Sequence, residues 1–218
     1  MVEVSTSILS VKKGEESKTF FALEKAKTDY FHIDVMDGKF VEKDTYNKML
    51  EYASYIKRIS NLPLDIHLMV EDVNSAIEDF IAVEPNIITF HLEACQNKEE
   101  IMGNINLIKE KGSRVGIAIK PETPIEEIYE YLPYIHMCLI MTVEPGKGGQ
   151  TLITDMIAKI STLKTYIERK KLEVDIEVDG GINETTGKQC KEAGVDVLVA
   201  GSYVFNSEDC SQRIASLK

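Results

Sequence analysis

Short apolar runs rich in β-branched residues alternate along the whole chain with longer amphipathic stretches. Alternation of this kind predicts βαβ units and therefore a parallel sheet. Eight such units are the number at which a parallel sheet closes into a barrel. The runs predicted as strands are Val2–Leu9, Tyr30–Met36, Leu64–Val70, Asn86–His91, Arg114–Ile119, Met137–Val143, Asp175–Asp179 and Asp196–Ala200.

The stretches between these runs have the character of helices, and one domain accommodates them all. An open, doubly wound sheet is the alternative, but it would usually have fewer strands and a GxGxxG turn after the first one, which this chain lacks. Linkers and repeats are also absent, so we predict a single (β/α)₈ TIM barrel over residues 1–218. The predicted helices include Lys48–Ile59, Val73–Val83, Glu99–Lys111, Ile125–Tyr131, Thr154–Arg169 and Glu184–Ala193.

Charge and cysteine content narrow the possible partners and the compartment. Lys and Arg number 25 against 36 Asp and Glu, and the net charge of −11 argues against nucleic acid or an anionic membrane as main partner. A small anionic ligand stays possible, because backbone dipoles can bind phosphate in an acidic protein. The four cysteines are widely spaced, and the sequence has no apolar run of about 18 residues. The first residues show no basic and apolar pattern, so we expect no signal peptide. We therefore expect reduced thiols in a cytoplasmic protein.

The most informative segment is FHIDVMDG, residues 31–38. Alternate side chains of a strand point to opposite faces, so His32, Asp34 and Met36 would face into the barrel while the apolar residues between them face the helices. Barrel enzymes place their catalytic groups at the carboxyl ends of strands, where these residues lie. A buried His–Asp ion pair without function is the alternative for this segment alone.

Two further strands repeat the arrangement. In LDIHLMV the same alternation turns Asp65, His67 and Met69 inward, and in DIEVDGG it turns Asp179 inward just before a Gly-Gly turn. Imidazoles and carboxylates from three strands that converge on one point suit a divalent transition metal, with Zn²⁺ first and Fe²⁺, Mn²⁺ or Co²⁺ as possible occupants. The alternative is a purely structural polar core. The candidate ligands are His32, Asp34, His67 and Asp179.

Glycine-rich turns follow the last three predicted strands: PGKGGQ at residues 145–150, Gly180-Gly181 and Gly201-Ser202. Glycines let backbone N–H groups approach an anion, and barrels commonly hold phosphate with the turns after strands 7 and 8. Each turn alone could be a simple tight connection. Together they indicate a phosphate site.

Combined, the two signals predict proton transfer beside a carbonyl. A metal that binds the carbonyl oxygen makes the neighbouring proton removable, and inversion needs one group on each face of that carbon. We expect Asp34 and Asp179 to be these two groups. The inward methionines Met36, Met69 and Met141 would line the pocket, although plain barrel packing explains them equally well.

The chain resembles the ribulose-phosphate 3-epimerase family nearly from end to end. No single stretch would suffice, but the set is specific. The matching stretches are SILS (residues 7–10), FHIDVMDGKFV, LDIHLMV, TFHLEA, GIAIKP, MTVEPGKGGQ, IEVDGGIN and AGVDVLVAGS.

The resemblance implies roles for individual residues. His32, Asp34, His67 and Asp179 correspond to the family's metal ligands, Asp34 and Asp179 also to its acid–base pair, and Ser7 and His67 to positions that contact the sugar. It further implies interconversion of D-ribulose 5-phosphate and D-xylulose 5-phosphate through an enediolate, and a homodimer or hexamer. The residues that match phosphate- and substrate-binding turns are Gly146, Lys147, Gly148, Gly149, Gly180, Gly181, Gly201 and Ser202.

Departures from the family pattern lie in the loops. Glu42-Lys43 replaces a Pro-Asn turn, Lys147 replaces an aromatic residue, Thr6 stands where Pro is common, and Glu122 where Gly is common. These changes could alter closure over the substrate or the accepted sugar length.

Other functions therefore stay open. Epimerases of ketohexose 6-phosphates such as allulose 6-phosphate share the pattern, and a non-catalytic phosphosugar-binding barrel is a further alternative. Ribulose-phosphate decarboxylases and aldol-type synthases resemble it less, because their strand lysine is missing here. His91 and Glu93 receive no role and are expected to be satisfied polar groups at the rim.

Overall fold

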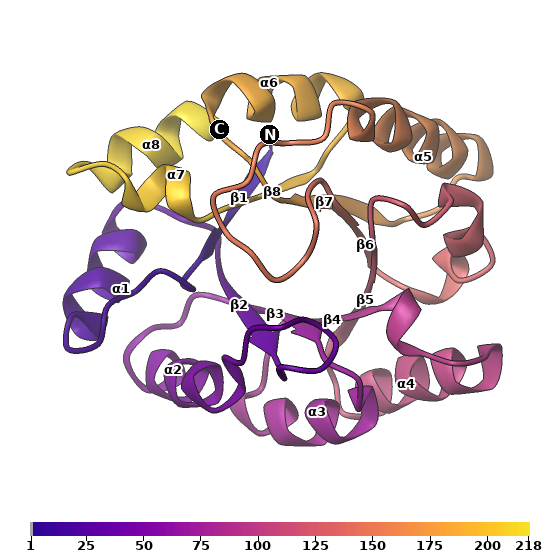
Figure 1. The fold of residues 1–218 in the computed structure, drawn as a ribbon, viewed down its shortest axis with the longest axis horizontal. Helices are drawn as coiled ribbons and strands as arrows, with labels where there is room; N and C mark the ends of the chain where they lie inside the picture. Colours follow the sequence, from indigo (N-terminus) through magenta and orange to yellow (C-terminus); the bar gives the residue numbers. More distant parts are fainter. Residues whose placement is uncertain (1) are drawn as a thin grey trace.

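The strands of the computed structural model, which describes residues 2–218, form a closed barrel (Figure 1). Each strand pairs in parallel with the next, and β8 returns to β1, so the described residues make the eight-stranded (β/α)₈ barrel that the alternation predicted. Each predicted run contains one strand. The strands are β1 (Glu3–Ser7), β2 (Tyr30–Met36), β3 (Leu64–Met69), β4 (Ile87–His91), β5 (Arg114–Ile119), β6 (Met137–Met141), β7 (Asp175–Asp179) and β8 (Val197–Ala200).

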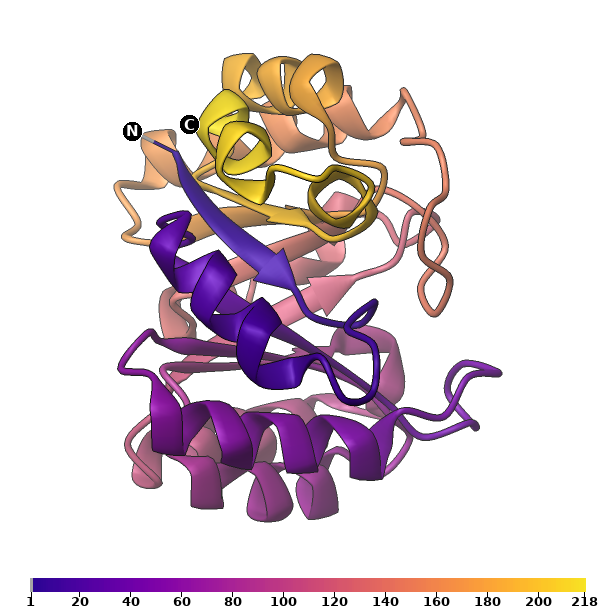
Figure 2. The same cartoon turned by 90° about the vertical axis from the view of Figure 1, so that its left-hand side faces the viewer.

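Helices surround the barrel as an outer ring (Figures 1 and 2). The α-helices are α1 (Glu16–Lys25), α2 (Tyr46–Ile59), α3 (Val73–Phe80), α4 (Lys98–Glu110), α5 (Met156–Lys170), α6 (Glu184–Ala193), α7 (Ser202–Phe205) and α8 (Cys210–Leu217). The 3₁₀ helices are η1 (Ile81–Val83), η2 (Leu92–Ala94), η3 (Ile125–Ile128) and η4 (Leu132–Tyr134).

The connection between β5 and β6 differs from the prediction. The segment Ile125–Tyr131 was expected to be helical in the manner of the others, but it contains only the four-residue 3₁₀ helix η3 before η4 begins. Pro124 precedes this segment and Pro133 follows it, and a proline lacks the N–H and the space that an α-helix needs. The two isoleucines at the ends of η3 are nevertheless buried, so the segment still covers the barrel.

Alternation along each strand separates two environments. In β2, Phe31, Ile33 and Val35 belong to the apolar core between strands and helices, as predicted. In β6, Met137, Leu139 and Met141 lie in two small apolar clusters apart from that core, inside the barrel. The interior is therefore apolar on the β5–β6 side. On the β1–β2–β3–β7 side it is polar, as the site below shows.

The register between β2 and β3 sets the height of the inward polar residues. It pairs His32 with Asp65, Asp34 with His67, and Met36 with Met69. Paired residues of neighbouring parallel strands point to the same face. Three layers result, and the acidic and histidine residues of the middle layer lie directly beneath two methionines.

Within residues 2–218, no helix is both long and apolar enough to span a membrane.

Candidate active site

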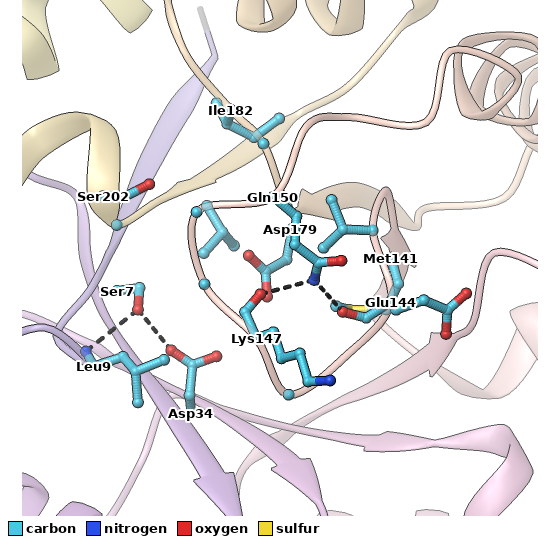
Figure 3. A pocket seen from close by; sticks show the side chains of 18 of the residues that line it. Ser7, Leu9, Asp34, Met141, Glu144, Lys147, Gln150, Asp179, Ile182 and Ser202 are labelled. Atoms are coloured by element: carbon cyan, nitrogen blue, oxygen red, sulfur yellow. Dashed lines mark hydrogen bonds between the residues drawn. The ribbon is translucent and has the colours of Figure 1, made fainter. Parts of the chain in front are cut away.

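A cavity of about 460 Å³ lies at the carboxyl ends of the strands. The loops that follow β2 and β6 project from this end of the barrel (Figure 2), and the loop after β6 crosses the mouth in Figure 1. Asp34 and Asp179 line the cavity floor from different strands, and Ser7 lies beside Asp34 (Figure 3). Active sites of α/β barrels occupy this end.

Four side chains predicted as metal ligands meet at the cavity floor. His32 Nε2 lies 3.5 Å from Asp34 Oδ1 and 4.0 Å from Asp179 Oδ2. His67 Nδ1 lies 3.8 Å from each of the same two oxygens. Zinc–ligand bonds of about 2.0–2.2 Å place tetrahedral ligands about 3.3–3.6 Å apart. The observed spacing is close to that value, so the four atoms can surround one divalent ion.

Two nitrogens of this group support the same conclusion independently. Among residues 2–218, neither His32 Nε2 nor His67 Nδ1 finds a hydrogen-bond partner, and both side chains are fully buried. Buried polar atoms in folded proteins are nearly always paired, and an exception needs an explanation. A cation that accepts both lone pairs, beside two carboxylates, supplies it. The residues present therefore fit a metal.

The two aspartates differ in acidity. Burial alone would raise the pKa of Asp34, but the neighbouring His32 and, after it, His67 hold that pKa well below its usual range. Burial raises the pKa of Asp179 to about 7, and the neighbouring Asp34 carboxylate adds to the rise. A pair of carboxyl groups pushed apart in this way is suited to opposite roles in proton transfer.

Hydrogen bonds hold Asp34 in place. Ser7 Oγ donates to Asp34 Oδ2 at 2.6 Å, while Asp34 Oδ1 faces the two histidines. Thr45 Oγ1 donates to the backbone carbonyl of Asp34 at 2.7 Å. One carboxylate oxygen is thus directed to the candidate metal position and the other toward the cavity side, where Ser7 lies.

A second acidic layer lies beneath the first. His32 Nδ1 donates to Asp65 Oδ2 at 2.5 Å, and Ser5 Oγ donates to the same oxygen at 2.7 Å. Glu177 brings a carboxylate oxygen within 4.8 Å of both residues, and burial, followed by the charge of Asp65, raises the pKa of Glu177 well above its usual range. A neutral Glu177 can share its proton with Asp65.

Sequence reasoning did not single out Glu177. Its signal was available, because Glu177 precedes Asp179 by two residues on the same face of β7.

His91 and Glu93 also contribute to the site, although no role for them was predicted from the sequence. His91 is fully buried, and its Nε2 lies 3.0 Å from His67 Nε2. Its Nδ1 lies 3.1 Å from Glu93 Oε2. Burial alone would raise the pKa of Glu93, but His91 together with donors from Thr123 and Lys120 lowers it to about 2. The expectation of satisfied polar groups is correct, but His91 lies behind a candidate ligand and not at the rim.

The residues predicted to contact substrate surround the same cavity. They come from the carboxyl ends of β1, β2, β3 and β6 and from the turns that follow β6, β7 and β8. The lining includes Ser7, Met36, Met69, Met141, Gly146, Lys147, Gly148, Gly149, Gly180, Gly181, Gly201 and Ser202. Lys43 and Gln150 line it too, and Gln150 closes the loop after β6 by donating to the carbonyls of Glu144 and Lys147 (Figure 3).

The Gly180-Gly181 turn requires glycine at both positions. Their φ angles are +122° and +66°, which side-chain-bearing residues rarely adopt. A Cβ would also lie 2.3 Å from the Val143 side chain at the first position and 2.4 Å from the backbone nitrogen of Leu152 at the second. The turn therefore brings bare backbone to the cavity, in contact with the β6 loop.

Lys147 reaches across the mouth toward the loop that follows β2. Its Nζ lies 3.9 Å from Glu42 Oε2, and both side chains are largely exposed. An ion pair of this kind contributes about 0–1 kcal/mol, so it holds the two loops together only weakly. The unusual residues of both loops thus meet at the entrance.

The fold and this site define an α/β-barrel enzyme whose chemistry lies at the carboxyl ends of the strands. Comparison with known proteins gives the family. Residues 3–205 match the model of the ribulose-phosphate 3 epimerase family, to which the chain belongs, and it is accordingly an isomerase.

Curated relatives of full length agree with the family match. The chain is 36% identical to the ribulose-phosphate 3-epimerase of Bacillus subtilis, over 100% of this chain and 99% of that protein. It is 38% identical to the ribulose-phosphate 3-epimerase of Methanocaldococcus jannaschii, over 100% of this chain and 90% of that one. It is also 38% identical to the chloroplastic ribulose-5-phosphate-3-epimerase of Arabidopsis thaliana, over 99% and 75%.

Solved structures share the barrel. A 3-hexulose-6-phosphate synthase superposes with a TM-score of 0.71 at 12% identity, over 99% of this chain and 98% of that one. A tryptophan synthase α-subunit from Pyrococcus furiosus gives 0.70 at 12% identity, over 99% and 96%. At such identities the likeness shows the fold alone.

Proposed function

We propose that this protein interconverts D-ribulose 5-phosphate and D-xylulose 5-phosphate by inverting carbon 3, with one divalent metal bound by His32, Asp34, His67 and Asp179. The names of the relatives support the substrate. The observation that carries the chemistry is the convergence of four ligand atoms within 4.8 Å of one another, two of them carboxylate oxygens from the separate strands β2 and β7.

The two aspartates are the acid–base pair. Asp34, ionised in its surroundings, takes the proton from carbon 3, and Asp179, whose pKa is raised to about 7, returns one on the opposite face. In the reverse direction the roles exchange. Ser7 holds Asp34 Oδ2 by its hydrogen bond and so fixes the oxygen that handles the proton.

The metal, Zn²⁺ foremost, supplies Lewis acidity that stabilises negative charge on the substrate's oxygens. The chain's own residues do the rest. The methionines Met36, Met69 and Met141 line the cavity with polarisable, apolar side chains that exclude water from the reacting carbon. Backbone at Gly180-Gly181, Gly201-Ser202 and residues 146–149 binds the phosphate, since these turns bring N–H groups to one side of the cavity.

Turnover with the metal restored tests the proposal. We would remove metal with a chelator, add back Zn²⁺, Mn²⁺, Fe²⁺ or Co²⁺ separately, and follow conversion of ribulose 5-phosphate, with allulose 6-phosphate beside it. We expect activity only with metal and a strong preference for the pentose. A preference for allulose 6-phosphate would make a ketohexose phosphate the substrate. Undiminished activity after chelation would refute the metal dependence.

A cytoplasmic location and assembly into a homodimer or hexamer stay part of the proposal. Neither membrane nor nucleic acid is an expected partner, since the net charge of −11 disfavours both.

A further inference from the structure

His91 and Glu93 form a hydrogen-bonded chain behind one of the two histidines of the site. The facing Nε2 atoms of His67 and His91 are 3.0 Å apart, and the two ring planes differ by 26° with centroids 5.1 Å apart. This near-coplanar arrangement is that of an N–H···N hydrogen bond. His91 Nδ1 continues the chain to Glu93 Oε2 at 3.1 Å.

The direction of the hydrogens follows from the far end of this chain. Glu93 Oε1 accepts from the backbone N–H of Lys120 at 2.7 Å and from the Thr123 hydroxyl. A carboxylate has no hydrogen to give, so His91 must donate from Nδ1. A neutral His91 then has its lone pair on Nε2 and accepts from the Nε2–H of His67.

We propose that Glu93 and His91 are positioning residues that fix the tautomer of His67, so that its Nδ1 lone pair faces the candidate metal position. This inference rests on the proposed function for the metal itself. The geometry agrees, since His67 Nδ1 faces Asp34 Oδ1 and Asp179 Oδ2 at 3.8 Å each. Outer partners of this kind set both the orientation and the basicity of a metal-binding histidine.

Neighbouring loops hold the chain in register. The carbonyls of Lys120 and Pro121 accept from Lys159 Nζ of α5 at 3.0 and 3.1 Å, which fastens the segment that donates to Glu93. Phe40, from the loop after β2, packs on the His91 ring with centroids 4.9 Å apart. The chain is therefore held from α5 and from two loops.

Replacing Glu93 by glutamine should reverse the direction of donation in the hydrogen bonds that join residue 93, His91 and His67. The backbone N–H of Lys120 can only donate, so the amide oxygen of Gln must face it and the NH₂ must face His91 Nδ1. His91 would then carry its hydrogen on Nε2 and donate to His67, whose remaining hydrogen would move to Nδ1. A hydrogen would occupy the lone pair that the metal needs. We expect Glu93→Gln to weaken Zn²⁺ binding by about 10–100-fold.

Long-range ¹H–¹⁵N correlation spectra of metal-free, ¹⁵N-histidine-labelled protein test the inference directly. We expect His67 protonated at Nε2 in the native chain and at Nδ1 in Glu93→Gln. Equilibrium dialysis with Zn²⁺ gives the affinities. The exposed Glu122→Gln, in the segment after β5 that donates to Glu93, is the matched control and is expected to match the native protein in both measurements.

Two results would overturn the inference: His67 protonated at Nδ1 in the native metal-free protein, or unchanged Zn²⁺ affinity in Glu93→Gln. The first measurement uses the native protein, so the inference can be refuted even if Glu93→Gln does not fold. Failure of the native protein to bind any metal would instead refute the proposed function. The nitrogen at which His67 is protonated would still be measured independently of that result.

Discussion

The two histidines of the site present one ring nitrogen each to the same point, but different groups stand behind them. His32 donates directly to a buried carboxylate, Asp65, which a second acid, Glu177, approaches from below. His67 donates to a second imidazole, and the carboxylate Glu93 comes only after it. Each chain ends in an acid, so the same chemical requirement is met directly behind His32 and through a second imidazole behind His67.

The difference shows in the acidity of the rings. Burial alone would lower the pKa of His32, but Asp65 and Asp34 raise it well above its usual value. Burial lowers the pKa of His67, and the neighbouring charge of His32 adds to this. His32, which donates to a carboxylate, is thus the more basic of the two rings, and His67, which donates to an imidazole, is neutral.

The largest effect should come from the groups that both histidines face. We expect Asp34→Asn to lower kcat by at least about 10³-fold, because the base becomes an amide. In D₂O, each of the variants Asp34→Asn and Asp179→Asn keeps one of the two bases. Each should therefore exchange the carbon 3 hydrogen of only one of the two epimers, and the two variants should act on different epimers. The exposed Asp155→Asn is the control. Near-native turnover of Asp34→Asn, with zinc content measured in parallel, would contradict the two-base assignment.

A second pair of variants, at Asp65 and Glu177, tests which of the two acids near His32 acts through a negative charge. Asp65→Asn should weaken Zn²⁺ binding by about 10–100-fold, because the acceptor that orients His32 loses its charge. Glu177→Gln should change the affinity by less than about threefold, since an amide of the same shape replaces an acid that is already neutral. Equal losses in both variants, measured by dialysis, would show that Glu177 acts as a carboxylate.

Acid titration of stability distinguishes the two histidine chains. Burial lowers the pKa of His91 to about 4, whereas in the unfolded chain it is about 6.5. The unfolded state therefore takes up a proton first, and the free energy of unfolding falls as pH drops from about 6.5 to 4. His32 has a raised pKa, so its contribution is complete below about 6.5 and is lost as pH rises through the higher folded value.

The measurement is urea unfolding of metal-free native protein and His91→Asn at several pH values. We expect the stability advantage of the native protein to shrink between pH 6.5 and 4. A pH-independent difference would mean that His91 does not stay neutral in the folded state.

The smallest effect should come from the entrance. Lys147→Gln should raise KM by up to about fivefold at low salt and less at high salt, because an exposed charge that attracts the phosphate is screened. Lys147→Arg keeps the charge and should behave like the native protein. A ratio of KM between Lys147→Gln and the native protein that does not change with salt would remove Lys147 from substrate attraction.

Much of this arrangement was predictable from the sequence. Strand alternation predicted the barrel, and period-two alternation turned His32, Asp34, His67 and Asp179 inward, where their ligand atoms converge. The sequence could not show which residues from distant segments form hydrogen bonds with one another when no recurring motif marks them. Glu93 meets Lys120 and Thr123 only because η2 and the segment after β5 lie side by side. The prolines around residues 125–131 were visible, but their effect on the helix was underestimated.

Closure of the barrel has a consequence for biosynthesis. Asp179 stands in β7, and β8 must still pair with β1 before the ring is complete. A nascent chain that has exposed β1 to β4 carries three of the four candidate ligands but lacks the oxygen that completes the set. If the four ligands are needed together, as proposed, tight metal binding has to wait until β7 has also left the ribosome.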